Sequence, residues 1–317
     1  MARELARHRY EAFGVTIESA FPLPELPALD DASATGAESP LDSTAADVEI
    51  RRGTVEPVTG ADDGEPGRSV AVDPDGLTVT FDVLGSVRVE GGERVVVDLL
   101  DETLASSKVL RRVIEGQILA VVLHQRGLLV LHASAVAIDD RAALFVGPQG
   151  AGKTTTAAAC YAEGFDLLDD DVVAVEIDDD GRPAVRPGVP ELKLYPETAT
   201  ALGVPVSPAE HHDAGSAKQY HYPSVDANRT TVPLAGCYRL ATGETLELTE
   251  IPPRERFVTL LVNTYTAGLL DETETSPEHF QLCSSVLDAA PIQELTRPDA
   301  LDDLPALADL VAEDLRS

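Results

Sequence analysis

The sequence predicts an α/β protein whose N-terminal part is rich in strands. Residues 1–100 alternate apolar and polar residues between Asp-Gly and Gly-Gly pairs, which is typical of strands joined by tight turns. Residues 145–156, FVGPQGAGKTTT, place a glycine-rich loop between an apolar strand and an alanine-rich helix. The length of 317 residues allows two domains. We therefore predict a β-rich domain over residues 1–100 and a linker helix plus α/β domain over residues 101–317.

The strands of the first hundred residues are predicted from their alternation. The segments are GVTIES, DVEIRR, SVAVDPDGLTVTFDV and SVRVEGGERVVVDLL. Residues 30–47 and 59–69 interrupt them with small and polar residues, glycine and proline. This composition predicts two flexible loops.

The middle of the chain alternates helices and strands. Residues 102–125 carry apolar residues at helical spacing and end before Gly127, which predicts a helix joining the two domains. The strands LLVLHASAVAI and AALFVG follow, with a turn at residues 139–141 between them. The segment KTTTAAACYAE favours a helix that ends at Gly164. FDLLDDDVVAVEI is predicted to be a strand, and DDDGRP a hairpin turn.

The last third of the chain mixes both classes. RERFVTLLVNTY and PEHFQLCSSVLDAA predict helices, the second with Ser276 as N-cap and Pro277 at its first position. PIQELTR predicts a strand, and ALDDLPALADLVAEDL a terminal helix.

The charge is strongly acidic. Asp and Glu number 55 against 24 Lys and Arg, which gives a formal net charge of −31, and only four residues are lysine. Because the acidic residues are spread along the chain, we interpret them as the surface of a protein from a salt-rich cytoplasm. A surface made for a basic partner is the alternative, although no single acidic tract dominates. The absence of a basic patch in the sequence argues against a nucleic-acid partner.

Cysteine usage and hydropathy bear on the compartment. Cys160, Cys237 and Cys283 are isolated and show no metal-binding spacing, as expected in a reducing environment. The first residues, MARELARHRY, have no apolar core, and no apolar run approaches the ~20 residues that span a bilayer. We therefore expect a cytoplasmic protein with no membrane partner.

The segment GPQGAGKT fits the phosphate-binding pattern G-x-x-x-x-G-K-[ST] in its required context. Glycines allow backbone N–H groups to converge on a phosphate, and the helix N-terminus adds partial positive charge. Lysine reaches the β- and γ-phosphates, and the following hydroxyl binds Mg²⁺. An ordinary glycine-rich turn is the alternative. The predicted nucleotide-binding residues are Gly147, Pro148, Gln149, Gly150, Ala151, Gly152, Lys153, Thr154 and Thr155.

An acidic cluster follows the loop closely. Asp169, Asp170 and Asp171 arrive at the end of the next strand, with Asp170 seventeen residues after Lys153. One carboxylate there can hold a metal ion, while a neighbour accepts a proton from an attacking hydroxyl. Surface acids of a salt-adapted chain are the alternative, but apolar residues flank the cluster on both sides.

Two histidine features are further candidates. His132 lies in the strand before the loop strand, where its imidazole could reach the phosphates, and a structural role is its alternative. His211, His212 and Asp213, with His221, could form a metal cluster, but their spacing fits no standard site.

The segments LHASAV, LFVGPQGAGKT and GFDLLDDDVVAVE resemble the C-terminal catalytic domain of HPr kinase/phosphorylase, a family that phosphorylates a protein serine. The close resemblance covers residues 131–175. YEAFGVTIESAFPLPELP near the start and NTYTAGLL and HFQLCSSVLDAAPIQELTRP near the end extend it to HPr-kinase-like proteins, including kinases of lasso-peptide clusters. The implied fold is a P-loop kinase domain of the HPr kinase and PEP carboxykinase type.

The resemblance implies roles for individual residues. Lys153 would contact the phosphates of ATP or another nucleoside triphosphate, and Thr154 the Mg²⁺ ion. Asp170 would be the general base and Asp171 the metal-linked partner, although either order is open. His132 would lie beside the transferring phosphate. Lys218, one of only four lysines, is a further candidate for a lid that brings charge to the γ-phosphate, and an ordinary exposed loop lysine is the alternative.

The resemblance also implies an activity and its partners. It is the transfer of the γ-phosphate to a hydroxyl, with a serine of a protein or peptide as the acceptor, and HPr kinases form homo-oligomers. The chain departs from the family where Thr154 and Thr155 replace Ser-Glu after the lysine, and the family's phosphorolysis signature is not found after residue 186. A phosphorylase activity is therefore not expected. A nucleotide-gated binding module and a small-molecule kinase are the alternatives.

Overall fold

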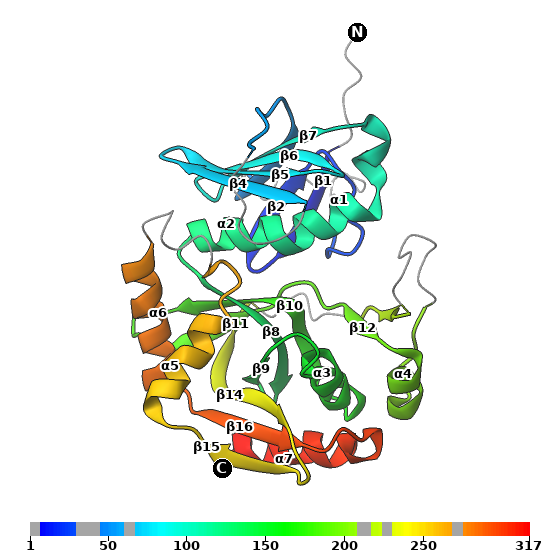
Figure 1. Ribbon diagram of the computed structural model, residues 1–317, viewed down its shortest axis with the longest axis vertical. Coiled ribbons are helices and arrows are strands. Elements are labelled where there is room, and N and C mark those ends of the chain that lie inside the picture. Colours follow the sequence, from blue (N-terminus) through cyan, green and yellow to red (C-terminus); the bar gives the residue numbers. More distant parts are fainter. Residues whose placement is uncertain (1–6, 30–44, 60–66, 208–216, 224–229, 268–274) are drawn as a thin grey trace, which may run out of the picture. The chain divides into compact units, whose positions relative to one another are not determined.

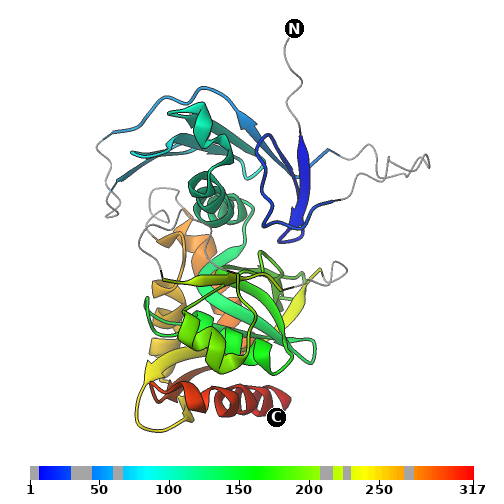
Figure 2. The same ribbon diagram turned by 90° about the vertical axis from the view of Figure 1, so that its right-hand side faces the viewer.

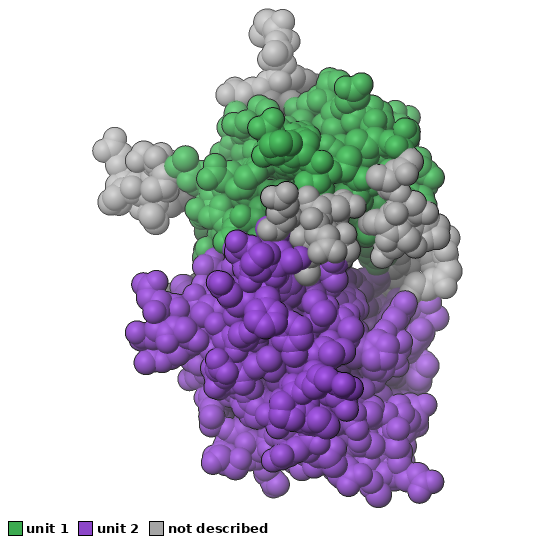
Figure 3. Space-filling view, turned by 60° about the vertical axis from the view of Figure 1, so that its left-hand side comes forward, with its two compact units in different colours: residues 1–126 green, residues 127–317 purple. Residues whose placement is uncertain are grey.

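A computed structural model describes residues 7–29, 45–59, 67–207, 217–223, 230–267 and 275–317. The chain divides into two compact units, Met1–Arg126 and Gly127–Ser317, which Figure 3 shows in different colours. The helical segment after residue 101 belongs to the first unit. The predicted loops 30–47 and 59–69 fall largely outside the described residues, although Arg68 and Ser69 are strand residues.

The first unit is built on a mixed seven-stranded sheet with the order β1-β2-β3-β7-β6-β5-β4. Strand β3 runs parallel to both β2 and β7, and the other pairs are antiparallel. Gly91 and Gly92 have φ values of 59° and 66°, which the tight turn between β6 and β7 requires. The strands are β1 (His8–Ala12), β2 (Val15–Ser19), β3 (Val48–Arg52), β4 (Arg68–Asp73), β5 (Gly76–Phe81), β6 (Gly85–Glu90) and β7 (Arg94–Leu99).

The predicted helix over residues 102–125 is not one continuous α-helix. It consists of a 3₁₀ turn, η2 (Glu102–Ser106), then α1 (Lys108–Val113), a π-helical turn, η3 (Ile114–Ile118), and α2 (Leu119–Gln125). The hydroxyl of Ser107 accepts the N–H of Leu110 and thereby begins α1. The N–H of Gly92 donates to the side chain of Gln125 at 2.7 Å, which ties the end of α2 to the sheet of the same unit.

The second unit is a mixed seven-stranded sheet with helices on both faces (Figures 1 and 2). The sheet order is β11-β10-β8-β9-β14-β16-β15, in which β9, β14 and β16 run parallel. This confirms the predicted mixed α/β architecture. The strands are β8 (Leu129–Ile138), β9 (Arg141–Val146), β10 (Asp166–Ile177), β11 (Pro183–Arg186), β14 (Val232–Thr242), β15 (Glu247–Glu250) and β16 (Ile292–Arg297). A separate ribbon is formed by β12 (Leu192–Leu194) and β13 (Gln219–His221).

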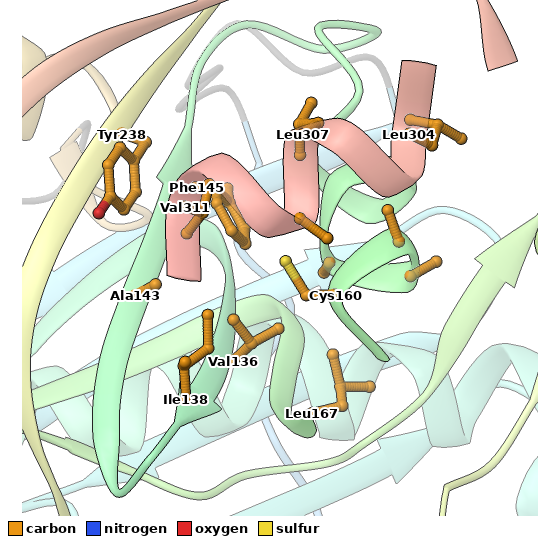
Figure 4. Close-up of a cluster of buried hydrophobic side chains, with 14 of the residues drawn as sticks. Val136, Ile138, Ala143, Phe145, Cys160, Leu167, Tyr238, Leu304, Leu307 and Val311 are labelled. Atoms are coloured by element: carbon orange, nitrogen blue, oxygen red, sulfur yellow. The ribbon is translucent and has the colours of Figure 1, made fainter. Parts of the chain in front are cut away.

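The two faces of this sheet carry separate cores. Because successive strand residues point to opposite faces, Val136 and Phe145 pack toward the helices α3 (Lys153–Ala162), α4 (Pro196–Leu202) and α7 (Leu304–Arg316). Figure 4 shows this core, to which α3 contributes Cys160 and α7 contributes Leu304, Leu307 and Val311. The alternate strand residues pack against α5 (Pro253–Val262) and α6 (Ser276–Ala289). A short 3₁₀ turn, η5 (Leu301–Asp303), leads into α7.

Two local details complete the fold. Ser276 was expected as the N-cap of α6, but Thr275 occupies that position and Ser276 is the first helical residue. The difference is one residue, and Pro277 lies in the first turn of the helix as expected. Within the described ranges, no helix combines the length and the apolar character needed to cross a membrane.

Candidate active site

The glycine-rich loop joins β9 to α3, as its flanking residues predict. Gly147, Gly150 and Gly152 have φ values of 149°, 84° and 96°, which residues with a Cβ rarely adopt. Gly152 is the N-cap of α3, so no side chain caps the N–H groups of the first turn. Pro148, Gln149 and Gly150 are exposed, and Ala151, Thr154 and Thr155 are half-buried. The loop therefore presents an uncapped helix N-terminus, which suits an anion.

Lys153 lies over this loop. Its side chain is buried, and Nζ donates to the carbonyl oxygen of Gly147 at 2.9 Å. Burial lowers the pKa of Lys153, and the charge of Lys218 adds to this, while Asp171 and Asp170 act in the opposite direction. A negatively charged phosphate beside the ammonium would oppose this effect of burial, because a nearby opposite charge favours the charged form of lysine.

Asn263, just after α5, fixes the start of the loop. Its Oδ1 accepts the N–H of Gly147 at 3.0 Å, and its Nδ2 donates to the carbonyl of Thr259 at 2.7 Å. Its own carbonyl accepts the N–H of His132 at 2.7 Å. Sequence reasoning missed this residue, because an asparagine at the end of a helix has many ordinary explanations.

The carboxylate of Asp170 is buried between two hydroxyls. Its Oδ1 accepts from Ser134 of β8 at 2.5 Å and from Thr154 of α3 at 3.0 Å. The strand register places Asp170 opposite Ser134 of β8, the strand that pairs with the loop strand β9. Burial raises the pKa of Asp170, and the two hydroxyl bonds oppose that rise. Thr154 therefore pairs with Asp170 and not with Asp171, the metal-linked partner implied by the family resemblance.

Asp169 differs from its neighbours. It is buried, and its carboxylate accepts the N–H groups of Val172 and Val189, the latter at 2.7 Å. Burial raises the pKa of Asp169 well above its usual value. The bond from Val189 ties β10 to the segment before β12, and the bond from Val172 lies within β10, so both oxygens of Asp169 are engaged by backbone N–H groups.

Asp171 is paired with His132 through a side-chain hydrogen bond. Nδ1 of the imidazole lies 3.0 Å from Oδ1 of the carboxylate, and both side chains are partly exposed, at 40% and 43%. Asp171 has a φ of 119°, a strained conformation for a residue with a Cβ. Desolvation raises the pKa of Asp171, but His132 and the charges of Lys193 and Lys153 outweigh it, so the net pKa lies below the ordinary value. Of the two adjacent aspartates Asp170 and Asp171, Asp171 is thus the more accessible one, and its lowered pKa keeps its carboxylate ionised at neutral pH.

Three of the four lysines of the chain lie in this region. Lys153 and Lys193 interact electrostatically with Asp170 and Asp171, and Lys218 interacts with Lys153. Lys193 on β12 pairs with Glu191 at 3.2 Å. Burial lowers the pKa of Lys193, but the carboxylates of Glu191, Asp171 and Asp170 raise it more. Lys218, the predicted lid residue, lies just before β13 with its ammonium 5.3 Å from the ring centre of Tyr195. Lys193 was not predicted, although the scarcity of lysine was a signal that could have found it.

The predicted histidine–aspartate cluster does not come together as a described site. His211, His212 and Asp213 lie outside the described residues, and His221 Nε2 forms a hydrogen bond with the hydroxyl of Tyr161 at 2.9 Å. Among the residues with a described placement, no group of three His, Cys, Asp or Glu side chains is arranged to hold a metal. The hydroxyl of Thr154 and the carboxylate of Asp170 are hard oxygen donors, the type that Mg²⁺ prefers when phosphates complete its shell.

Comparison with known proteins adds little to this site. No protein-family model matches the chain, and no curated protein matches it. A solved structure of the Hpr(Ser) kinase/phosphatase from Coxiella burnetii is similar over 59% of this chain and 95% of that chain, with 12% sequence identity and a TM-score of 0.30. Such a TM-score is too low to carry an assignment, so the site rests on its own residues.

Proposed function

We propose that this chain is an ATP- and Mg²⁺-dependent phosphotransferase that moves the γ-phosphate to a hydroxyl of a protein or peptide. The observation that carries the proposal is that the adjacent carboxylates of Asp170 and Asp171 have different partners and different exposure. Asp170 is bonded to Thr154 of the loop, and Asp171 is held by His132 with part of its side chain exposed. A module that only binds nucleotide has no need of a second, ionised carboxylate at this place.

The loop and Lys153 would hold the phosphates. Backbone N–H groups at the start of α3 and the ammonium of Lys153 neutralise their charge. Thr154 and Asp170 would hold Mg²⁺, which would offset the negative charge that develops during transfer. Ser134 fixes the Asp170 carboxylate through its short hydrogen bond.

Asp171 is the general base in this proposal. Its carboxylate accepts the proton of the acceptor hydroxyl as that oxygen bonds to the γ-phosphorus and the bond to the bridging oxygen of ADP breaks. Because His132 and two lysine charges keep the pKa of Asp171 below its ordinary value, the base is ionised at neutral pH. The roles are therefore assigned in the order opposite to the one first implied by the family resemblance. A serine acceptor is proposed on that resemblance alone.

The test is transfer of label from γ-labelled ATP to proteins of the source cell, with Mg²⁺ and at high salt. We expect a discrete labelled protein or peptide with the wild-type chain and with Asp179→Asn, an exposed aspartate at the far end of the same strand hairpin. Lys153→Ala and Asp171→Asn should abolish the labelling.

Two results would contradict the proposal. Tight ATP binding without label transfer or phosphate release would favour the nucleotide-gated binding module. Label in a small molecule, with no labelled protein or peptide, would favour a metabolite kinase.

A further inference from the structure

Arg297 is the last residue of β16 and lies against the glycine-rich loop. Strands β9, β14 and β16 run parallel, so their carboxyl ends meet at one edge of the sheet, where the loop begins (Figure 1). A Cβ added to Gly152 would clash with Nη2 of Arg297, and it would lie 3.3 Å from Cζ and 3.5 Å from Nε. The guanidinium thus occupies the space that the missing side chain of Gly152 leaves open.

Within the part of the chain that the structure describes, no carboxylate balances the charge of Arg297. The residue is only 8% exposed, Nη1 donates to the carbonyl of Pro298 at 3.0 Å, and the buried Nε has no hydrogen-bond partner. Across the described ranges, no carboxylate forms an ion pair with it. Arginine remains charged in proteins, and a buried cation without a counter-ion costs free energy.

A neighbouring arginine shows the contrast. Arg239 of β14 pairs with Glu294 at 2.8 Å and with Glu255 at 3.2 Å. In a chain with 55 acidic residues, the lack of an acidic partner for Arg297 points to an anion from outside the protein.

The order of the strands indicates which part of a bound nucleotide would lie beside Arg297. The loop strand β9 lies between β8 on one side and β14, then β16, on the other. Asp170 and Asp171 lie on the β8–β10 side, so a γ-phosphate facing them directs the nucleoside end toward β14 and β16. Arg297 lies on that nucleoside side, directly against the residue that precedes Lys153.

We propose that Arg297 binds the α-phosphate of the nucleotide. This inference rests on the proposed function, since it takes the direction of the nucleotide from the acidic pair. The planar guanidinium can donate its unpartnered Nε–H together with Nη2 to two oxygens of one phosphate. Arg297 is then a binding residue that ATP and ADP both use.

The test compares nucleotide affinities of Arg297→Gln, Arg297→Lys and the matched control Arg239→Gln in the full-length chain. ATP and ADP are titrated with Mg²⁺ at one fixed salt concentration. Because a hydrogen-bonded charge contact is lost, we expect Arg297→Gln to raise both Kd values at least about tenfold and by the same factor. Arg297→Lys should recover part of the affinity, and Arg239→Gln should leave both Kd values within about twofold, a margin within what surface substitutions change.

The outcomes separate this inference from the proposed function. A loss for ATP but not ADP would place Arg297 at the γ-phosphate and overturn the α-phosphate assignment. Unchanged Kd values in a variant with a normal melting curve would give Arg297 a structural role only. If the Gln variant does not fold, the Lys variant replaces it. An equal rise of the ATP and ADP Kd values in the Lys variant supports the α-phosphate assignment, and unchanged Kd values contradict it. If the wild type fails to bind ATP, or Lys153→Ala binds it equally well, the proposed function itself fails.

Discussion

At the scale of single residues, the two adjacent aspartates Asp170 and Asp171 differ in burial and in the direction of their pKa shifts. Asp170 is buried between Ser134 and Thr154, and Asp171 is partly exposed beside His132. Burial raises the pKa of the first, and hydrogen bonding with nearby positive charge lowers the pKa of the second. Because strand residues alternate in direction, neighbours in the sequence face different environments.

We predict that substitutions at Asp170 and at Asp171 affect different steps, nucleotide binding in the first case and phosphate transfer in the second. Asp170→Asn should weaken Mg²⁺-dependent ATP binding at least about tenfold, because a metal-linked carboxylate is lost. Asp171→Asn should leave the ATP Kd nearly unchanged and lower kcat by about 10²–10⁴-fold, because a general base is lost. Equilibrium titration and single-turnover transfer measure the two effects. If Asp171→Asn raised the ATP Kd and left kcat intact, the assigned roles would be reversed.

A second residue-scale prediction concerns Asn263. Replacing it with alanine leaves the buried N–H of Gly147 without an acceptor, which costs about 1–3 kcal/mol of unfolding free energy. Chemical denaturation of the full chain measures this loss, and weaker ATP binding should accompany it. Gln281→Ala, which removes an exposed amide from α6, should change stability by no more than about 0.5 kcal/mol. Equal effects of the two variants would show that Asn263 does not hold the loop.

At the scale of elements, ion pairs between strands stabilise the sheet of the first unit. Arg88 of β6 donates to both oxygens of Asp73 of β4 at 2.8 and 2.9 Å, across the intervening strand β5. The same carboxylate accepts the N–H groups of Asp75 and Gly76 in the β4–β5 turn. The bond from Arg88 is the largest cause of a pKa of about 2 for Asp73.

This ion pair predicts a pH-dependent contribution to stability. The pKa of Asp73 is lower in the folded chain than the ordinary value of 3.8 for an aspartate, so its contribution is complete above about pH 5 and is lost as the pH falls toward 2. Asp73→Asn should therefore destabilise the protein at pH 7, and the difference from wild type should shrink as the pH falls from 5 to about 3. Denaturation at several pH values tests this. The exposed Asp75→Asn is the control, and a pH-independent difference for Asp73→Asn would contradict the expectation.

At the scale of the whole molecule, charge repulsion is the dominant electrostatic feature. The formal net charge of −31 acts against the compact state, and salt reduces this repulsion because the screening length falls from ~10 Å at 0.1 M to ~3 Å at 1 M. We predict a melting temperature that rises steadily over this range. Sodium chloride and sodium sulfate at equal ionic strength separate charge screening from effects of the anion on hydration. A melting temperature that does not respond to either salt would contradict the salt-adapted interpretation of the surface.

The sequence by itself determined the elements around the loop. Short apolar runs predicted the strands that became β8, β9 and β10, and the Gly152–Lys153–Thr154 pattern predicted the helix start, because these signals are local in the chain. Gly164, with a φ of 93°, ends α3 as predicted. Weak local signals were missed or misjudged. The strands of the β12–β13 ribbon are short, and the segment 102–125 contains a π-helical turn that periodicity does not reveal.

Only the tertiary structure decided which distant residues meet the loop. Asn263 and Arg297 are 116 and 145 residues beyond Gly147 and Gly152, and they reach the loop through the end of α5 and the parallel pairing of β14 with β9 and β16. The different surroundings of Asp170 and Asp171 also depended on strand register, since it places Ser134 opposite Asp170 and His132 within reach of Asp171. Sequence patterns record local periodicity, whereas register and strand order arise from packing between segments far apart in the chain.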